Sequence, residues 1–142
     1  MVRTRKRGGM RDRDMNIADF QKRVTTWVLT CFPTNVAATR QERVFRFLEE
    51  ALELCQSLDM SQEDADRVVR YVYGRPVGEP FQEVGGVFVT IAALCWNDGI
   101  DMQDAAFSEL IRIEKPEIME KIRAKQNAKS AVGMGMSTES SS

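Results

Sequence analysis

Three glutamates lie close together in the segment FLEEALEL, at positions 49, 50 and 53. If this segment is helical, Glu50 and Glu53 are one turn and about 60° apart, so both carboxylates can reach the same point. Glu83 opens a second apolar segment, QEVGGVFVT. If the two segments pack side by side as helices, three or four carboxylates converge. Such a cluster of hard oxygens is what Mg²⁺ binds, together with waters and the phosphates of a substrate.

The same spacing is also compatible with an ordinary wet helix face. Glutamate is a good helix former, and Glu49 and Glu53 point away from the centre of the apolar face that holds Val44, Leu48 and Cys55. On spacing alone, both interpretations stay open. A metal site here would need a second apolar surface, such as a dimer partner, to enclose it.

The composition excludes several classes of chemistry. The chain of 142 residues has no histidine, which excludes His-based acid–base catalysis, Ser-His or Cys-His nucleophiles and His-containing metal sites. The three cysteines, Cys31, Cys55 and Cys95, are far apart and lie in apolar helical patterns, so we expect buried free thiols in a reducing cytoplasm. No apolar run approaches the ~20 residues of a membrane span, and we expect a cytoplasmic protein without membrane contacts.

Helical periodicity and capping residues predict an all-α fold, a bundle of four main helices plus one or two short ones. The predicted helices run from Asn16 to Pro33, from 39 to 58, from Ser61 to Gly74, from 80 to 97 and from Asp101 onward, with Pro116 opening a short final helix. The apolar faces of the second and fourth helices should be buried. No segment alternates with period two, so we expect no sheet.

Two tails flank the predicted domain. Residues 1–14 hold six basic and two acidic side chains, a net charge of +4, while the whole chain carries −1. We therefore expect a disordered basic tail over 1–14, a single helical domain over 15–128 and a disordered Gly/Ser-rich tail over 129–142. The acidic body argues against nucleic acid as its partner. A DNA-associated factor that uses the basic tail is the less favoured alternative.

The order of three motifs resembles a known family. EEALE in one helix, EVGG opening another and NDGIDMQDA starting the next resemble the MazG-like all-α nucleoside triphosphate pyrophosphohydrolases, most closely their small phage-type members, over about residues 42–127. The resemblance implies hydrolysis of a ribo- or deoxyribonucleoside triphosphate to monophosphate and pyrophosphate. It also implies dependence on Mg²⁺, or on Mn²⁺ in its place, and a homodimer or higher homo-oligomer.

The family's metal pattern, EExxE followed by ExxD, can be carried over residue by residue. It implies Glu50, Glu53 and Glu83 as metal ligands, with Glu49 and Glu53 as catalytic residues; Glu49 would bind a second metal or orient the attacking water. The last position of the pattern is Gly86 here instead of aspartate. Glycine either permits close approach of a helix or nucleotide or leaves a weakened, nucleotide-binding or protein-interaction module. We favour a retained but altered site, because the other three glutamates are present.

A triphosphate also requires cationic partners. Arg112, Lys121 and Lys125 are the candidates for phosphate binding, and Lys121 and Lys125 share a helix face by their i,i+4 spacing. A solvated basic face explains the same residues. The sequence therefore predicts these phosphate contacts only as candidates.

Overall fold

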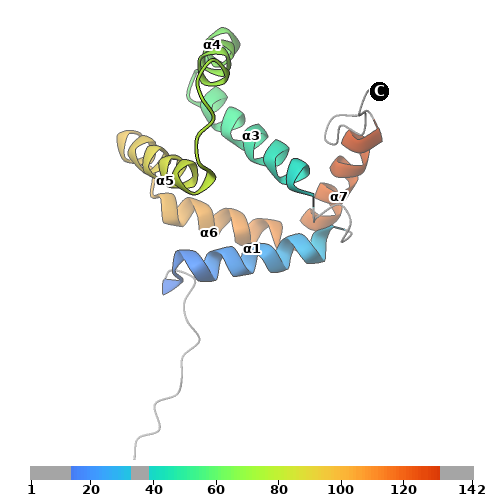
Figure 1. The fold of residues 1–142 in the computed structure, drawn as a ribbon. Helices are drawn as coiled ribbons and strands as arrows, with labels where there is room; N and C mark the ends of the chain where they lie inside the picture. The colour runs from blue at the N-terminus through green and yellow to red at the C-terminus, as the bar shows by residue number, and fades with distance from the viewer. Residues whose placement is uncertain (1–13, 33–38, 132–142) are drawn as a thin grey trace, which may run out of the picture.

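The computed structural model describes residues 14–32 and 39–131, and within these ranges the chain is helical with no strand. The helices are α1 (Ile17–Cys31), α3 (Arg40–Ser57), α4 (Gln62–Tyr73), α5 (Pro80–Asn97), α6 (Met102–Ile113) and α7 (Pro116–Ala131) (Figure 1). The predicted all-α class is confirmed. Of the tails predicted over 1–14 and 129–142, residues 1–13 and 132–142 lie outside the described residues, as does the predicted helix stop at Pro33.

The helix boundaries follow from local capping chemistry. Asn16, Ser61 and Asp101 each accept a hydrogen bond from the backbone N–H three residues later, at 2.9, 3.1 and 2.9 Å. Such a cap satisfies one of the otherwise unpaired donors at a helix start. After α5, Gly99 takes a φ of 66°, a left-handed conformation that favours glycine and reverses the chain toward α6.

The last helix differs from the prediction. α7 contains 16 residues and continues to Ala131, so the expectation of a short final helix is wrong, and the predicted domain boundary at 129 falls within it. Apart from Ser130, the Gly and Ser residues that suggested a tail follow Ala131. Helix-favouring Ala, Lys and Gln residues carry α7 through its last turns.

Helices α1, α6 and α7 form the base of the molecule. α7 packs against both α1 and α6. Phe20 of α1 meets Phe107 of α6 edge-to-face, with ring centroids 5.3 Å apart. Leu110 of α6 is 1% exposed, and the indole of Trp27 donates a hydrogen bond to the carbonyl of Ile113 at 2.7 Å. Apolar burial and a satisfied indole N–H thus hold α1 on α6.

Two arginines reinforce the base by binding across helices. The Arg23 guanidinium donates to both carboxylate oxygens of Glu114, at 2.8 and 2.5 Å, a two-point pairing of α1 with the end of α6. From α7, Arg123 donates to the carbonyls of Cys31 and Thr30, at 2.5 and 2.9 Å. Arg123 therefore satisfies carbonyl groups that the C-terminal end of α1 leaves without helical partners.

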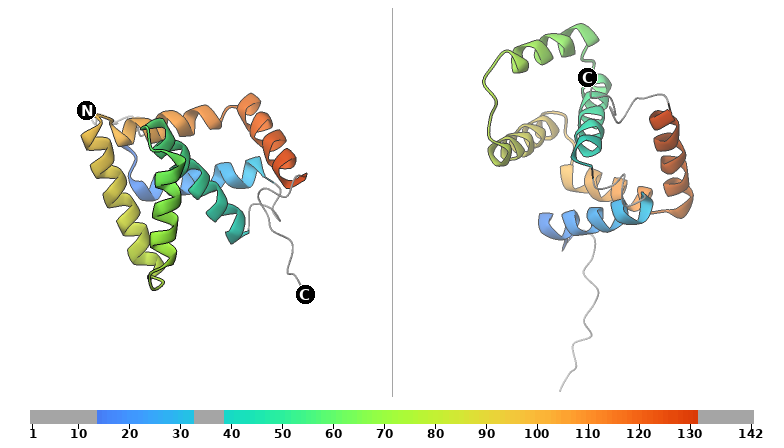
Figure 2. Two further views of the ribbon diagram at one scale, coloured as in Figure 1. Left: turned by 90° about the horizontal axis from the view of Figure 1, so that it is seen from above. Right: turned by 45° about the vertical axis from the view of Figure 1, so that its right-hand side comes forward.

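Helices α3, α4 and α5, residues 40–97, form an open U that extends from the base, hereafter the arm (Figures 1 and 2). The helix pairs that pack most extensively involve α7 with α1 and with α6, and α3 and α5 do not pack along each other. The side-by-side packing on which a convergence of the carboxylates depends is therefore not formed within the described chain.

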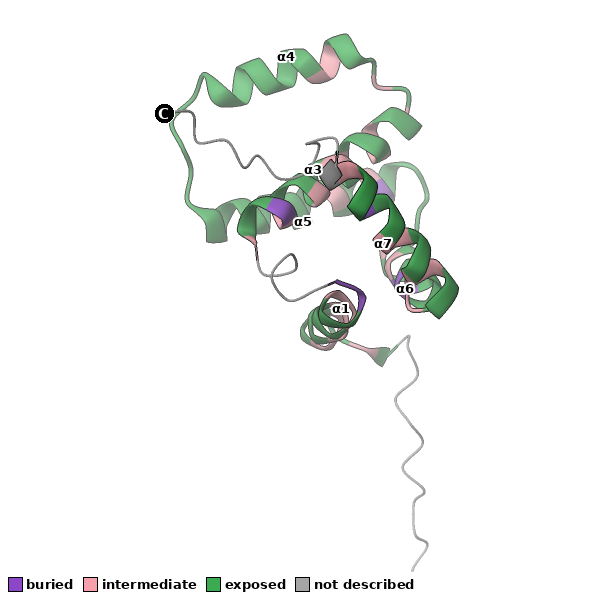
Figure 3. Cartoon of the chain, turned by 90° about the vertical axis from the view of Figure 1, so that its right-hand side faces the viewer, coloured by how far each residue is buried: buried purple, intermediate pink, exposed green. Residues whose placement is uncertain are grey.

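The expected burial of the arm's apolar faces is also wrong within one chain. Val44 and Phe47 on α3 are exposed, and on α5 Cys95 alone is buried (Figure 3). The reason is that no other part of the described chain covers these faces. Cys31 and Cys95 are buried free thiols, as expected, whereas Cys55 is only half-buried.

Candidate functional site

The Glu50 carboxyl on α3 lies among other carboxylates. Loss of solvent around this carboxyl raises the pKa of Glu50, and the negative charges of Glu53, Glu109 and Glu49 raise it further. The side chain as a whole remains exposed. Because Glu109 belongs to α6, the structure brings carboxylates from the arm and the base together. Glu50 and Glu53 are thus neighbours, as the sequence predicted.

Glu49 is held differently from Glu50, although it is the next residue. Arg46 donates to one carboxylate oxygen at 2.5 Å, and Lys129 of α7 forms an ion pair with the other. The hydrogen bond from Lys129 lowers the pKa of Glu49, and the charge of Arg46 adds to this effect. Glu49 is therefore ionised and oriented toward cations on both sides.

The N-terminal part of α3 fixes the position of these carboxylates. Glu42 is fully buried, and its Oε1 atom lies 2.9 Å from Nε of Arg46. Because Arg46 also pairs with Glu49, it links Glu42 to Glu49 along one side of the helix. Next to Glu42, the Arg43 guanidinium stacks on the Phe32 ring at 5.3 Å, which attaches α3 to the end of α1. A buried carboxylate such as Glu42 is tolerated because it is ion-paired.

Glu83 lies apart from these groups. It occupies the first turn of α5, and its carboxylate folds back beside Gly78, where any side chain would collide with it. No set of three acidic or cysteine side chains within residues 14–32 and 39–129 converges closely enough to hold a metal ion. The predicted convergence of Glu50, Glu53 and Glu83 is therefore not formed within a single chain.

The glycine pair of α5 faces open space. A Cβ atom built on Gly85 or Gly86 would meet no atom of another element within 4 Å. The described chain therefore does not bring a helix close to these glycines, as the first explanation of the pair required. It also leaves room for the carboxylate that the family pattern has at position 86.

The predicted phosphate-binding residues are distributed over two helices. Arg112 of α6 donates two hydrogen bonds to Glu109, of 2.9 and 2.6 Å. These bonds raise the pKa of Arg112, and the charge of Glu50 adds to the effect. The charge of Lys125 on α7 helps to lower the pKa of Glu49. Lys121 is exposed on the same helix. Arg112 thus contacts a carboxylate, the charge of Lys125 acts on Glu49, and the described contacts show no such link for Lys121.

Sequence reasoning missed two residues of this site, Glu109 and Lys129. Glu109 and Arg112 are a recognisable i,i+3 pair, but nothing in this local spacing indicates that α6 lies beside α3. Lys129 was assigned to the C-terminal tail because Gly and Ser follow it. Only the extended length of α7 brings it to Glu49.

No protein-family model matches this sequence, and neither a curated protein nor a solved structure matches it. Within the described ranges, no helix combines the length and the apolar character needed to cross a membrane. The carboxylates of α3 and α6 and their cationic neighbours are the basis for a functional proposal.

Proposed function

We propose that the protein is a Mg²⁺-dependent nucleoside triphosphate pyrophosphohydrolase that converts a ribo- or deoxyribonucleoside triphosphate and water to monophosphate and pyrophosphate. The placement of Glu50 beside Glu53 and Glu109 is the main observation in its support. Loss of solvent is the main cause of the raised pKa of Glu50, and the negative charges of Glu53, Glu109 and Glu49 raise it further, so these carboxylates repel one another. A bound cation would relieve this repulsion. The motif order that resembles MazG-like enzymes supports the same activity.

The residues take distinct roles in this proposal. Glu50 and Glu53 hold Mg²⁺, or Mn²⁺ in its place, through hard oxygen ligands. When bound, the metal neutralises phosphate charge and lowers the pKa of a coordinated water. Glu49, kept ionised by Lys129 and Arg46, orients the attacking water or binds a second metal.

Glu83 is proposed as the third ligand. Because its carboxylate is turned toward Gly78 in the described chain, this role requires α5 to approach α3 when metal and nucleotide bind. Arg112 and Lys125 are close enough to the carboxylates to act on their charges. They are therefore the first candidates for contacts with the phosphates, and Lys121 is a weaker one.

A product assay tests the proposal. Purified full-length protein is incubated with Mg²⁺ and each common ribo- and deoxyribonucleoside triphosphate, and monophosphate, pyrophosphate and phosphate are separated by chromatography. We expect monophosphate and pyrophosphate in equal amounts from at least one nucleotide. The Glu53→Gln variant keeps the size and hydrogen-bonding shape of the side chain but removes its charge, so it should lose hydrolysis while remaining folded.

Glu63→Gln is a matched control, because it makes the same change at an exposed position of α4. It should leave the rate unchanged. Hydrolysis that persists in Glu53→Gln would show that the site is assigned wrongly. Absence of product from every nucleotide, with the protein folded, would reject the enzymatic proposal.

A second candidate function is a nucleotide-binding or protein-interaction module with weakened catalysis, and Gly86 is the observation that favours it. The open space around position 86 permits a direct test by the Gly86→Asp variant. If the missing carboxylate limits turnover, this variant should bind Mg²⁺ more tightly and hydrolyse nucleotide faster than the wild type. An inactive wild type together with an active Gly86→Asp variant would establish the weakened module.

A further inference from the structure

Positive charge surrounds the Glu49 carboxylate. Arg46 donates to one of its oxygens at 2.5 Å, and the ammonium of Lys129 forms an ion pair with the other. The hydrogen bond from Lys129 lowers the pKa of Glu49 most, and the charge of Lys125 adds to this effect. Three cations therefore act on a single carboxylate, and together they oppose the approach of a divalent metal ion to it.

The next residue, Glu50, has negative surroundings. Loss of solvent raises the pKa of its carboxyl, and the charges of Glu53, Glu109 and Glu49 raise it further. Neither Glu50 nor Glu53 forms an ion pair within residues 14–32 and 39–131. A divalent cation is therefore attracted to Glu50 and Glu53, while the adjacent Glu49 already has its cations.

The position of Lys129 beside Glu49 is fixed by the packing of α7. Earlier in this helix, Arg123 donates to the carbonyls of Thr30 and Cys31 at the end of α1. These contacts attach α7 to the base, and its last turns then carry Lys129 to α3. The ammonium is thus placed by the fold, and not by a flexible segment of the chain.

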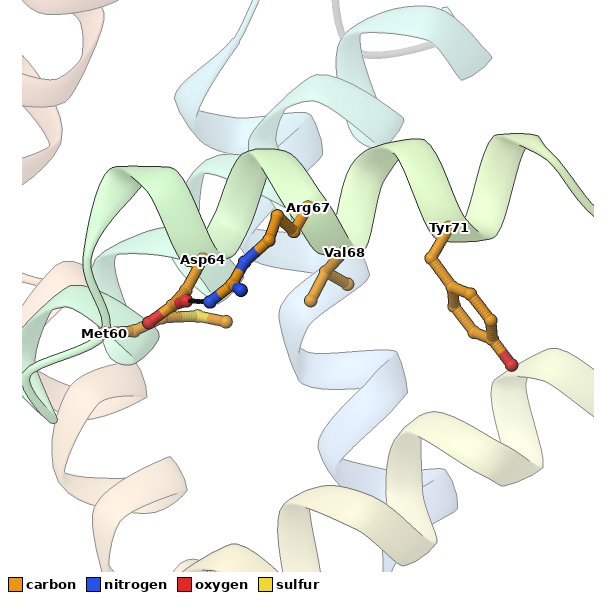
Figure 4. A pocket seen from close by; sticks show the side chains of 5 residues that line it. All are labelled: Met60, Asp64, Arg67, Val68 and Tyr71. Atoms are coloured by element: carbon orange, nitrogen blue, oxygen red, sulfur yellow. Dashed lines mark hydrogen bonds and ion pairs between the residues drawn. The ribbon is translucent and has the colours of Figure 1, made fainter.

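Another ion pair of the arm lacks this dependence on the fold. Asp64 and Arg67, which border the hollow of about 450 Å³ on α4, pair within one helix at i,i+3 spacing (Figure 4). Helix geometry alone brings such a pair together. Lys129 and Glu49 are 80 positions apart on different helices. Their pairing therefore requires α7 and α3 to meet at the glutamate segment.

We propose that the Lys129 ammonium takes the place beside Glu49 that a second metal ion would take, so that the site binds a single metal ion, at Glu50 and Glu53. Glu49 then orients the attacking water, one of the two roles left open by the proposed function, on which this inference rests. A carboxylate has about four lone-pair positions. Arg46 and Lys129 use one on each oxygen, so Glu49 can still accept a hydrogen bond from water. Lys129 is a positioning residue that acts through Glu49.

Counting bound metal ions tests this assignment in the full-length protein. Mn²⁺ is added without nucleotide, and the free ion is measured by electron paramagnetic resonance. Lys129→Met should bind one Mn²⁺ more per chain than the wild type, because Glu49 loses the cation that takes the place of the ion. Lys129→Arg keeps the positive charge and should bind the same number as the wild type. Adding Glu49→Gln to Lys129→Met should remove the additional ion, which would locate it at Glu49.

Arg67→Met is the matched control. It removes the cationic partner of Asp64, so it frees another carboxylate of the arm, but the number of bound ions should stay that of the wild type. Helix content by circular dichroism shows whether each variant is folded. If Lys129→Met does not fold, Lys129→Gln makes the same comparison. An unchanged number in Lys129→Met, an equal increase in Arg67→Met, or an additional ion that persists without the Glu49 carboxylate would overturn the proposal.

The metal count and the product assay give separate answers. Hydrolysis of a nucleotide by the wild type, with an unchanged ion count in Lys129→Met, would retain the hydrolase and reject the role of Lys129. The expected ion counts without hydrolysis of any nucleotide would reject the hydrolase and retain Lys129 as the cation that replaces a metal ion beside Glu49.

Discussion

Lys129 on α7 forms an ion pair with Glu49 on α3, although the two residues are 80 positions apart in the chain. This pair connects the C-terminal helix to the start of the glutamate segment. Arg46 contacts the other oxygen of Glu49 at 2.5 Å. The first glutamate of the motif is therefore anchored to the base, whereas Glu50, the next one, is crowded by other carboxylates.

Replacing Lys129 by methionine tests the role of this pair. The pKa of Glu49 should rise toward its ordinary value, because the hydrogen bond that lowers it most is lost. Titration of the side-chain carboxyl carbons by NMR measures this change. Since both side chains are partly exposed, the cost in unfolding free energy at neutral pH should be about 1 kcal/mol or less. Lys121→Met, at an exposed position of the same helix, should change neither quantity.

The sign of the pH dependence follows from the lowered pKa of Glu49. Below its folded-state pKa the carboxyl is protonated both in the folded and in the unfolded protein, and the pair contributes nothing. Above the unfolded value, about 4.3, the contribution is complete. The difference in stability between wild type and Lys129→Met should therefore disappear as the solution is acidified below this value. A difference that stays constant into acid would contradict the ion pair.

Glu50 should show the opposite sign. Its raised pKa means that the folded state disfavours the ionised form, a penalty that is complete above the folded-state pKa and absent below the unfolded value. Glu50→Gln should therefore raise the melting temperature at neutral pH in the absence of metal, and the two proteins should melt alike below about pH 4. Mg²⁺ should stabilise the wild type but stabilise the variant less. A variant that melts lower at neutral pH would contradict the crowding of carboxylates.

Local sequence signals were enough to predict the helices. Capping residues such as Asn16 and Ser61 act within one turn, and their hydrogen bonds are present as expected. The end of α7 was missed because Gly and Ser after residue 131 suggested an earlier stop. Burial was missed for a different reason. Periodicity shows that a face is apolar, but not whether its own chain covers it, as the exposed Val44 and Phe47 demonstrate.

The candidate site was predictable only in part, for a similar physical reason. Glu50 and Glu53 are neighbours through helix geometry alone, so their proximity could be predicted. Bringing Glu83 to them depends on how α3 and α5 pack, which helical spacing does not determine. The charge of Glu109 on α6 acts on Glu50, and no spacing in the sequence predicts that α6 lies near enough to α3 for this effect.

Leu110 should be among the most sensitive positions of the base. Its side chain is 1% exposed, and truncation to alanine leaves a cavity that the packed helices close only partly. Leu110→Ala should lower the unfolding free energy by about 2–5 kcal/mol, measured by urea unfolding. The adjacent Ile111 is 41% exposed, so Ile111→Ala should cost about 1 kcal/mol or less. Equal effects at the two positions would show that the base is packed differently.

Gly85 distinguishes the two explanations of the glycine pair in α5. A Cβ at this position meets no atom of another element within 4 Å in the described chain. Gly85→Ala should therefore raise the unfolding free energy by about 0.5–1 kcal/mol, because alanine loses less backbone entropy in a helix. Ala93→Gly, at an exposed position of the same helix, should lower the unfolding free energy by a similar amount. If Gly85→Ala instead destabilises the protein, another helix approaches this backbone closely in solution, and the glycines are required for packing between helices.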